Sequence, residues 1–233
     1  MFEAVGDATS RSPGQHARAS VRRLRLRTLV TLGLLAVATA LLGRELGTRD
    51  VRFLAAELAL LVSMFVIARY VLPLVERRDR GASAEELVGS LLEELARDGW
   101  RVMHDASFGH GNVDHIVIGR AGVFTVETKS HPGPVRVRRL HGGALRQAQA
   151  QRDAIERATG FDVEPLLVFS RAWVDKPLAR RNGVRVLPAR MLLSYLARQP
   201  SALSGQEVDR AHGAVVAALR RAEGARARLT YWQ

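Results

Sequence analysis

Two apolar runs dominate the first third of the chain. Residues 28–43, TLVTLGLLAVATALLG, hold no charged side chain, and residues 53–75 hold only Glu57 and Arg69. A helix needs about 17 to 25 residues to cross a hydrocarbon core about 30 Å thick, and Leu24, Leu26 and Leu46 can extend the shorter run. The polar link RELGTRDVR joins the two runs. The pattern therefore predicts a two-helix transmembrane hairpin over residues 28–75.

Three other structures could give the same pattern. A soluble protein can bury a helical hairpin, but the first run is apolar all round rather than on one face. Ala38-Thr39-Ala40 resembles a signal-peptide cleavage site, although the preceding arm is long and a second span follows at once. Arg22-Arg23 lacks the rest of a twin-arginine export signal. The hairpin remains the leading interpretation.

Arginines flank the hairpin unevenly. Residues 1–27 read as a basic, disordered arm, and short runs of arginine also follow the second span and occupy the link. After position 17 the arm holds Arg18, Arg22, Arg23, Arg25 and Arg27. The segment after the second span holds Arg77, Arg78 and Arg80, and the link holds Arg44, Arg49 and Arg52. Because positive residues near spans are retained in the cytoplasm, we expect a bacterial inner-membrane protein with both termini in the cytoplasm.

Beyond Gly81 the pattern changes to alternating helix and strand signals. Ser83 and Glu86 have the spacing of a capping box, which would open a helix ending at Gly99. Strands are expected at 100–103, 113–118, 123–128, 135–137, 166–169 and 184–187, and helices at 144–158, 189–197 and 207–223. This order predicts an α/β domain with a mixed sheet flanked by helices over residues 81–198, followed by a C-terminal helix within residues 204–225.

Charge and composition narrow the possible partners. The 35 Lys+Arg residues exceed the 23 Asp+Glu residues, for a net charge of +12, and only Lys129 and Lys176 are lysines. Arginine-rich charge favours phosphate, in a nucleic acid or in lipid headgroups, although genome composition also raises arginine usage. With no cysteine, disulfides and thiolate metal sites are excluded.

The segment GNVDHIVIGRAGVFTVETKS carries the candidate chemistry. If the GRAG turn closes a symmetric hairpin, Ile118 faces Val123 and Asp114 faces Glu127. Facing carboxylates repel unless something compensates. A divalent cation would do so, and oxygen ligands suit Mg²⁺ or Mn²⁺. Lys129 would project on the same face as Glu127. The alternative is therefore a purely structural ion pair of Lys129 with one carboxylate at a sheet edge.

These motifs resemble a known family. Glu85 in a helix, GNVDHIVIG around Asp114, and GVFTVETK through Glu127 and Lys129 are similar to the nuclease-related (NERD) family, itself similar to the PD-(D/E)XK nuclease superfamily. The resemblance covers about Gly81 to Gln151 and continues more weakly to Leu196. It implies a restriction-endonuclease-like fold, a metal site at Asp114 and Glu127, a catalytic Lys129 and an accessory acid on the first helix. The chain departs from the superfamily name in lacking a proline before Asp114.

Helical spacing selects among the neighbouring polar candidates. Glu85 lies above Val88 and Leu92, on the margin of the core stripe, whereas Glu86 does not, so Glu85 is expected to be the accessory acid. Gln147 and Gln151 lie one turn apart on the helix after the strands, where similar proteins place a glutamine near the site. Of the two, Gln147 is the preferred candidate.

Basic and histidine residues surround the motif. The arginines after the site are candidate phosphate contacts, with a solvated basic face as the alternative: Arg136, Arg138, Arg139 and Arg146, with Arg152 nearby. His104, His110, His115 and His131 lack metal-ligand spacing, and His115 should point to the opposite sheet face from Asp114. We treat the histidines as packing or surface residues.

The sequence thus favours a membrane-anchored, Mg²⁺- or Mn²⁺-dependent nuclease that hydrolyses phosphodiester bonds, with DNA the expected substrate. The alternative is a non-catalytic, membrane-tethered module that binds nucleic acid or a protein on the same fold. A purely structural lipid-binding protein would make no use of the paired acids and ranks last. No feature of the sequence identifies a protein partner.

Overall fold

The computed structural model describes residues 13, 15–46, 51–108, 112–140 and 142–230. The chain divides into two compact units, one of His16–Ala82 and the other formed chiefly by Ser83–Gln233. The first unit is helical. The second is a mixed α/β domain.

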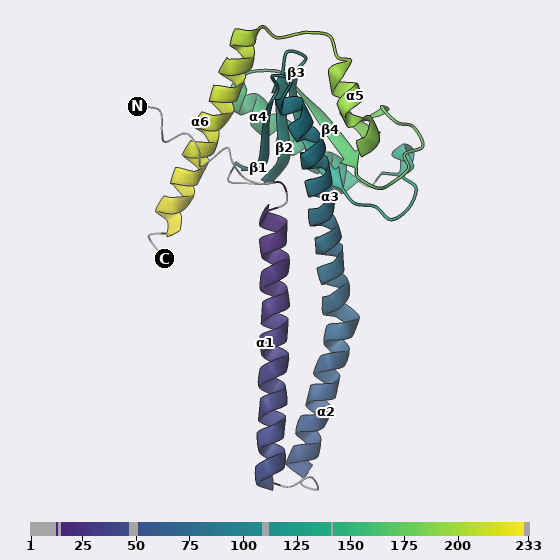
Figure 1. Cartoon of the computed structure of the whole chain (residues 1–233), viewed down its shortest axis with the longest axis vertical. Helices are drawn as coiled ribbons and strands as arrows, with labels where there is room; N and C mark the ends of the chain where they lie inside the picture. The colour runs from purple at the N-terminus through teal and green to yellow at the C-terminus, as the bar shows by residue number, and fades with distance from the viewer. Residues whose placement is uncertain (1–12, 14, 47–50, 109–111, 141, 231–233) are drawn as a thin grey trace. The chain divides into compact units, whose positions relative to one another are not determined.

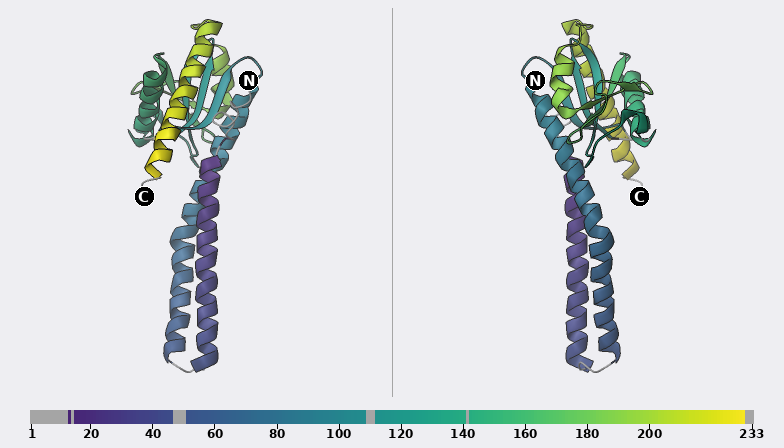
Figure 2. Two further views of the ribbon diagram at one scale, coloured as in Figure 1. Left: turned by 90° about the vertical axis from the view of Figure 1, so that its left-hand side faces the viewer. Right: turned by 90° about the vertical axis from the view of Figure 1, so that its right-hand side faces the viewer.

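The helical unit is an antiparallel hairpin. Helix α1 (Gln15–Leu46) lies beside α2 (Val51–Val66) and the first turns of α3 (Leu72–Ala96) in every view (Figures 1 and 2). At one end Arg25 Nη2 lies 3.3 Å from Asp79 Oδ2. Near the other end a Cβ on Gly43 would lie 2.5 Å from the Phe53 ring, so glycine at this position lets the two helices approach.

A π-helical turn, η1 (Ile67–Val71), connects α2 and α3 without breaking the helix. The Leu72 N–H donates to the Ile67 carbonyl, five residues earlier. Pro73 follows directly, and proline has no N–H to continue the ordinary ladder. A π-turn is a common way for a helix to absorb such a disruption.

Both helical segments are apolar on their outer surfaces. Two helices, Arg18–Leu41 and Val51–Ala96, are long and apolar enough to cross a membrane by length and composition. Large apolar side chains are exposed along them: Leu29, Leu34 and Leu41 on the first, and Leu58, Leu61 and Phe65 on the second. Soluble proteins rarely expose so extended an apolar surface.

Two expectations about helix boundaries were wrong. Residues 15–27 belong to α1 rather than to a disordered arm, while residues 1–12 and 14 lie outside the described residues. Ser83 and Glu86 lie inside α3, which begins at Leu72, so Ser83 is not an N-cap. In both cases arginine, leucine, glutamate and alanine are good helix formers, and extending an existing helix costs less than nucleating a new one.

The α/β unit is built on a six-stranded mixed sheet in the order β1-β2-β3-β4-β6-β5. Strands β1 to β3 are antiparallel, β3, β4 and β6 are parallel, and β5 is antiparallel to β6. The strands are β1 (Arg101–Ser107), β2 (Asn112–Gly119), β3 (Gly122–Lys129), β4 (Val163–Phe169), β5 (Arg180–Arg181) and β6 (Val184–Pro188). The predicted α/β mixed sheet is therefore confirmed.

Helices cover both faces of this sheet (Figure 1). On one face α3 and α5 (Leu192–Ala197), preceded by the 3-10 turn η3 (Ala189–Met191), pack their leucines over β2, β3, β4 and β6. On the other, α4 (Gly142–Thr159) and α6 (Gly205–Thr230) pack over the sheet. Residues 135–137, expected to be a strand, form only an isolated bridge from Val135 to Val174 and then the 3-10 turn η2 (Val137–Arg139).

Candidate active site

The β2–β3 hairpin has the predicted register. Its turn consists of Arg120 and Ala121, Gly119 pairs with Gly122, and the paired positions continue to His115 with Val126. Gly122 has a φ of 132°, a conformation that favours glycine. The predicted pair of Asp114 and Glu127 lies one step beyond this last paired position.

The two acids occupy adjacent strands and have different partners. Asp114 Oδ2 accepts a hydrogen bond of 2.8 Å from the Thr128 backbone N–H. The Glu127 side chain is 1% exposed, and its Oε1 forms an ion pair with Lys129 Nζ. Its Oε2 accepts a hydrogen bond of 2.5 Å from Gln151 Nε2. The alternative of a Lys129 ion pair is thus present, but on the central strand β3 rather than at a sheet edge.

Helix α4 supplies two glutamines to this cluster. Lys129 Nζ donates to Gln147 Oε1 at 3.1 Å. Gln151 Nε2 donates to the Asn112 carbonyl at 2.9 Å as well as to Glu127. Gln147 was the preferred candidate, but Gln151 is the buried one. Its spacing could have shown this, because Gln151 continues the core stripe of Leu145, Ala148 and Ile155.

Burial raises the pKa values of three carboxyls, and repulsion by neighbouring carboxylates adds to the shifts of Asp114 and Glu85. Burial, followed by the charges of Glu127 and Glu85, raises the pKa of Asp114 well above its ordinary value. Burial also raises the pKa of Glu127, although Lys129 opposes this shift. The pKa of Glu85 rises to about 7, first through burial and then through the charges of Asp105 and Glu127. One lysine therefore faces more carboxyl charge than it can neutralise.

The first-helix acid and a further acid complete the cluster. Glu85, on α3, is near enough for Glu127 and Lys129 to change its pKa. Asp105 was missed because β1 was expected to end at residue 103, whereas it continues to Ser107. Asp105 is buried, has a φ of 50°, and its Oδ1 accepts a hydrogen bond from Asn112 Nδ2 at 3.2 Å.

The donor set fits a hard divalent cation held by few protein ligands. Within the described part of the chain, no group of three or more His, Cys, Asp or Glu side chains is arranged to hold a metal ion. Mg²⁺ commonly binds through one or two carboxylates and keeps several waters. Asp114 and Glu127 supply two carboxylates, and the excess negative charge around them is what such an ion would neutralise.

Residues 80–170 match the nuclease-related domain (NERD) family model. This NERD segment contains all five residues of the predicted site, Glu85, Asp114, Glu127, Lys129 and Gln147, and it confirms the resemblance seen in their motifs. It ends at Ser170, so β6, α5 and α6 lie outside it. Comparison with curated proteins and with solved structures gives no match.

The arginines predicted to contact phosphate lie on two parts of the NERD segment. Arg136, Arg138 and Arg139 are exposed on the stretch that follows β3, and Arg146 is exposed on α4, next to Gln147. Arg136 and Arg139 help to line a hollow of about 230 Å³ together with His131. These positions leave the basic side chains accessible to a ligand.

Among the described residues, the histidines of the NERD segment contact groups other than Asp114 and Glu127. His104 Nδ1 and His115 Nδ1 lie 2.8 Å apart, and a Cβ on Gly89 of α3 would lie 3.4 Å from the His115 ring. Burial, followed by the charge of His104, lowers the pKa of His115 to about 3. His131 packs edge-on against Phe169, with ring centroids 6.4 Å apart. His110 lies outside the described residues.

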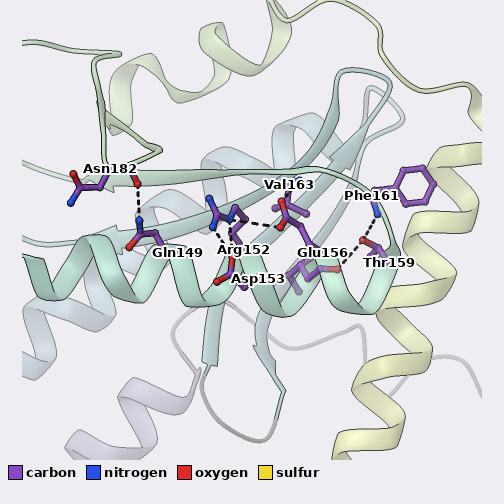
Figure 3. A network of polar contacts seen from close by, with 9 residues as sticks. Gln149, Arg152, Asp153, Glu156, Thr159, Phe161, Val163 and Asn182 are labelled. Atoms are coloured by element: carbon purple, nitrogen blue, oxygen red, sulfur yellow. Dashed lines mark hydrogen bonds and ion pairs between the residues drawn. The ribbon is translucent and has the colours of Figure 1, made fainter.

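A cleft away from the carboxyl cluster is shared by the NERD segment and residues that follow it. It measures about 660 Å³ and is lined by Val123 and Val163, whereas Lys129 pairs with Phe169 at the other end of the same two strands. Arg152 and Glu156 of α4 line it and belong to a polar network that fixes this helix (Figure 3). In that network Gln149 Nε2 donates to the Asn182 carbonyl at 2.7 Å, and the Val163 N–H donates to Glu156 Oε1 at 3.1 Å. The network holds α4 to its neighbours and so keeps Gln147 and Gln151 in reach of β3.

Proposed function

We propose that this chain is a membrane-anchored, metal-dependent phosphodiesterase that hydrolyses nucleic acid, with DNA as the expected substrate. The observation that carries the proposal is the crowding of Glu85, Asp114 and Glu127 around Lys129 within a segment that matches a nuclease-related family. Buried carboxyls with raised pKa values and a single neutralising cation are typical of functional sites.

The residues divide the chemistry between them. Asp114 and Glu127 would hold Mg²⁺ or Mn²⁺, which, when bound, polarises a phosphate oxygen and makes water more acidic. Lys129, held by Glu127 and Gln147, would stabilise negative charge that develops on the phosphate. In the metal-free site Glu85, with a pKa of about 7, can hold or release a proton near neutral pH. Gln151 would orient the Glu127 carboxylate.

The membrane anchor of the proposal is the helical hairpin. Its apolar exposed surface would face lipid, and a span needs about 20 residues, so residues 53–75 suffice and the charged remainder of α3 lies beyond them. The arginine distribution supports cytoplasmic termini and a cytoplasmic catalytic domain at the bacterial inner membrane. Nucleic acid would then share a compartment with the site.

Cleavage assays test the enzymatic part. The full chain in detergent should cut plasmid, linear or single-stranded DNA with Mg²⁺ or Mn²⁺ and stop with EDTA, and an RNA substrate assigns the nucleic acid. Asp114→Asn should abolish cleavage, whereas Asp98→Asn, the same change at an exposed turn residue, should leave it intact. Equal activity of both variants would contradict the proposed site.

One observation favours a second function. Both oxygens of Glu127 are already engaged, by Lys129 and Gln151, as expected if the site were only an ion-pair network. The chain would then be a non-catalytic, membrane-tethered module that binds nucleic acid or a protein. Metal-independent DNA binding by the wild type without any cleavage would support this alternative.

A further inference from the structure

A basic hollow lies outside the candidate active site. It measures about 510 Å³ and is lined by Val137, Arg138, Lys176, Ala179, Arg180 and Arg181. Four of these six side chains are cationic, and none carries a carboxylate. The cations come from two stretches of chain: Arg138 from the η2 turn, and Lys176, Arg180 and Arg181 from the β4–β5 loop and strand β5.

Most of this positive charge is not neutralised. Within the described residues, neither Arg138 nor Lys176 has a carboxylate partner, and both are exposed. Arg181 Nη1 donates to the Val137 carbonyl at 2.5 Å, a neutral partner that orients the guanidinium and leaves its charge uncompensated. Only Arg180 is paired, with Glu164 Oε1 at 2.7 Å.

Backbone hydrogen bonds fix the two walls to each other. The Val135 N–H donates to the Trp173 carbonyl at 2.7 Å, and the Asp175 N–H donates to the Val135 carbonyl at 3.0 Å. Asp175, the nearest acid in the sequence to Lys176, accepts the Val137 N–H on Oδ1 at 2.9 Å, so its carboxylate holds the walls together. A hollow built this way loses little entropy when it binds a ligand.

Both walls of the hollow are continuous in sequence with strands that lead to the candidate active site. In the sequence, the η2 wall comes after strand β3, which ends at Lys129, and the other wall comes after strand β4. The N–H of Ser170, the residue directly after β4, donates to the Lys129 carbonyl at 3.1 Å. The smaller hollow of Arg136 and Arg139 lies on the same η2 stretch. Beyond Lys129, the exposed cations Arg136, Arg138 and Arg139 follow on this stretch.

We propose that the hollow of Arg138, Lys176 and Arg181 binds a backbone phosphate of the nucleic acid, away from the bond that is cut. This inference rests on the proposed function for its ligand. It adds the β4–β5 loop, with Lys176, and strand β5, with Arg181, to the substrate path. The arginines after β3 did not indicate this part of the chain. The guanidinium and ammonium groups would contact phosphate oxygens and read no base.

The two lysines of the chain allow a direct test. Lys129 and Lys176 are its only lysines, so acetylation with an amine-reactive ester, followed by peptide mapping, reports the active site and the hollow separately. The full chain in detergent is acetylated in the presence of EDTA, once without nucleic acid and once with a duplex oligonucleotide. We expect the oligonucleotide to lower the labelling of Lys176 several-fold. Unchanged labelling of Lys176 beside protected Lys129 would overturn the inference and leave the proposed function standing.

Other arms separate the remaining outcomes. Protection of Lys176 by DNA in a protein that never cleaves would uphold the hollow and defeat the enzyme. Protection by phosphatidylglycerol vesicles but not by DNA would overturn the inference in favour of lipid headgroups. Lys176→Gln should reduce the dependence of log K for duplex binding on log salt concentration by up to about 0.9 in slope. Arg198→Gln makes the same charge change at an exposed residue that lines neither basic hollow, and it should leave the slope unchanged. Equal slopes for the two variants would contradict the proposal.

Discussion

At the scale of single residues, Asp114 has two conflicting roles that one substitution separates. Its charge repels Glu127 and Glu85, while its Oδ2 accepts the Thr128 N–H. Asp114→Asn keeps an acceptor and removes the charge, so the metal-free protein should hold its stability or gain a few tenths of a kcal/mol. The variant should also lose the rise in melting temperature that Mg²⁺ gives the wild type. Thermal melts in EDTA and in Mg²⁺ measure both effects.

An ion-pair network predicts the opposite result for the same variant. Breaking a buried charge network leaves an unpaired charge and costs about 3 kcal/mol or more. A wild type that ignores Mg²⁺, together with a strongly destabilised Asp114→Asn, would defeat the nuclease proposal and leave the binding module.

The raised pKa of Glu85 leads to a specific dependence of stability on pH. Because its pKa is about 7 in the folded chain and 4.5 ordinarily, the folded state holds a proton that the unfolded state has released between these values. The free energy of unfolding should therefore fall as pH rises through this window. The glutamine of Glu85→Gln stays neutral, so the stability of this variant relative to the wild type should increase from about pH 5 to about pH 8 in EDTA.

The measured quantity is the difference in free energy of unfolding between the wild type and Glu85→Gln at each pH. His104 and His115 have lowered pKa values because they are buried, so they contribute stability that is lost as pH falls below about 6.5 and oppose the Glu85 effect. The histidines are present in both proteins and cancel in the difference. A difference that stays constant with pH would show that Glu85 has an ordinary pKa.

At the scale of elements, the continuity of α3 is open to measurement. If Ser83 were an N-cap, Ser83→Ala would cost about 1 kcal/mol; inside a continuous helix it should cost nothing, since alanine is the better helix former. Gly81→Ala meets no atom within 4 Å of the new Cβ and should raise the free energy of unfolding by about 0.5–1 kcal/mol. Melts of the full chain in detergent test both, and destabilisation by both would restore a helix boundary near Gly81.

The η2 stretch gives a second element-scale prediction. Replacing Arg136, Arg138 and Arg139 together with alanine should weaken nucleic-acid binding equally for all sequences, because phosphate contacts carry no base information. The salt slope for duplex DNA should fall by up to about 0.9 per lost contact. Fluorescence anisotropy over a salt series measures it, and an unchanged slope would mean that these arginines form a solvated face.

At the scale of the whole molecule, topology decides whether the site meets nucleic acid. The arginine asymmetry predicts that Gln233 lies in the cytoplasm and Gly47 in the periplasm. A reporter that works only in the cytoplasm should therefore be active when fused after Gln233, and one that works only in the periplasm should be active when inserted at Gly47. Both positions lie outside the described residues and can be assayed in cells. Reversed reporter activities would refute the orientation and, with it, access of the domain to cytoplasmic DNA.

The sequence by itself determined the features that depend on neighbours along the chain. The apolar runs predicted the two long helices, and the GRAG turn with strict alternation predicted the β2–β3 register, since both depend on local geometry and period. The cluster of Asp114, Glu127 and Lys129 follows from that register. The start of α1 at Gln15 and the continuity of α3 through residues 76–83 were missed, because charged residues can end a helix or simply face solvent.

Only the tertiary structure decided which distant elements meet these residues. Packing of α4 on the sheet buries Gln151 against Glu127, and packing of α3 brings Glu85 into reach of both acids. Likewise, the bridge between Val135 and Val174 places Lys176 beside η2 and forms the basic hollow. Such contacts come from the burial of apolar surface between elements far apart in sequence, which has no preferred spacing along the chain, so no local pattern announces them.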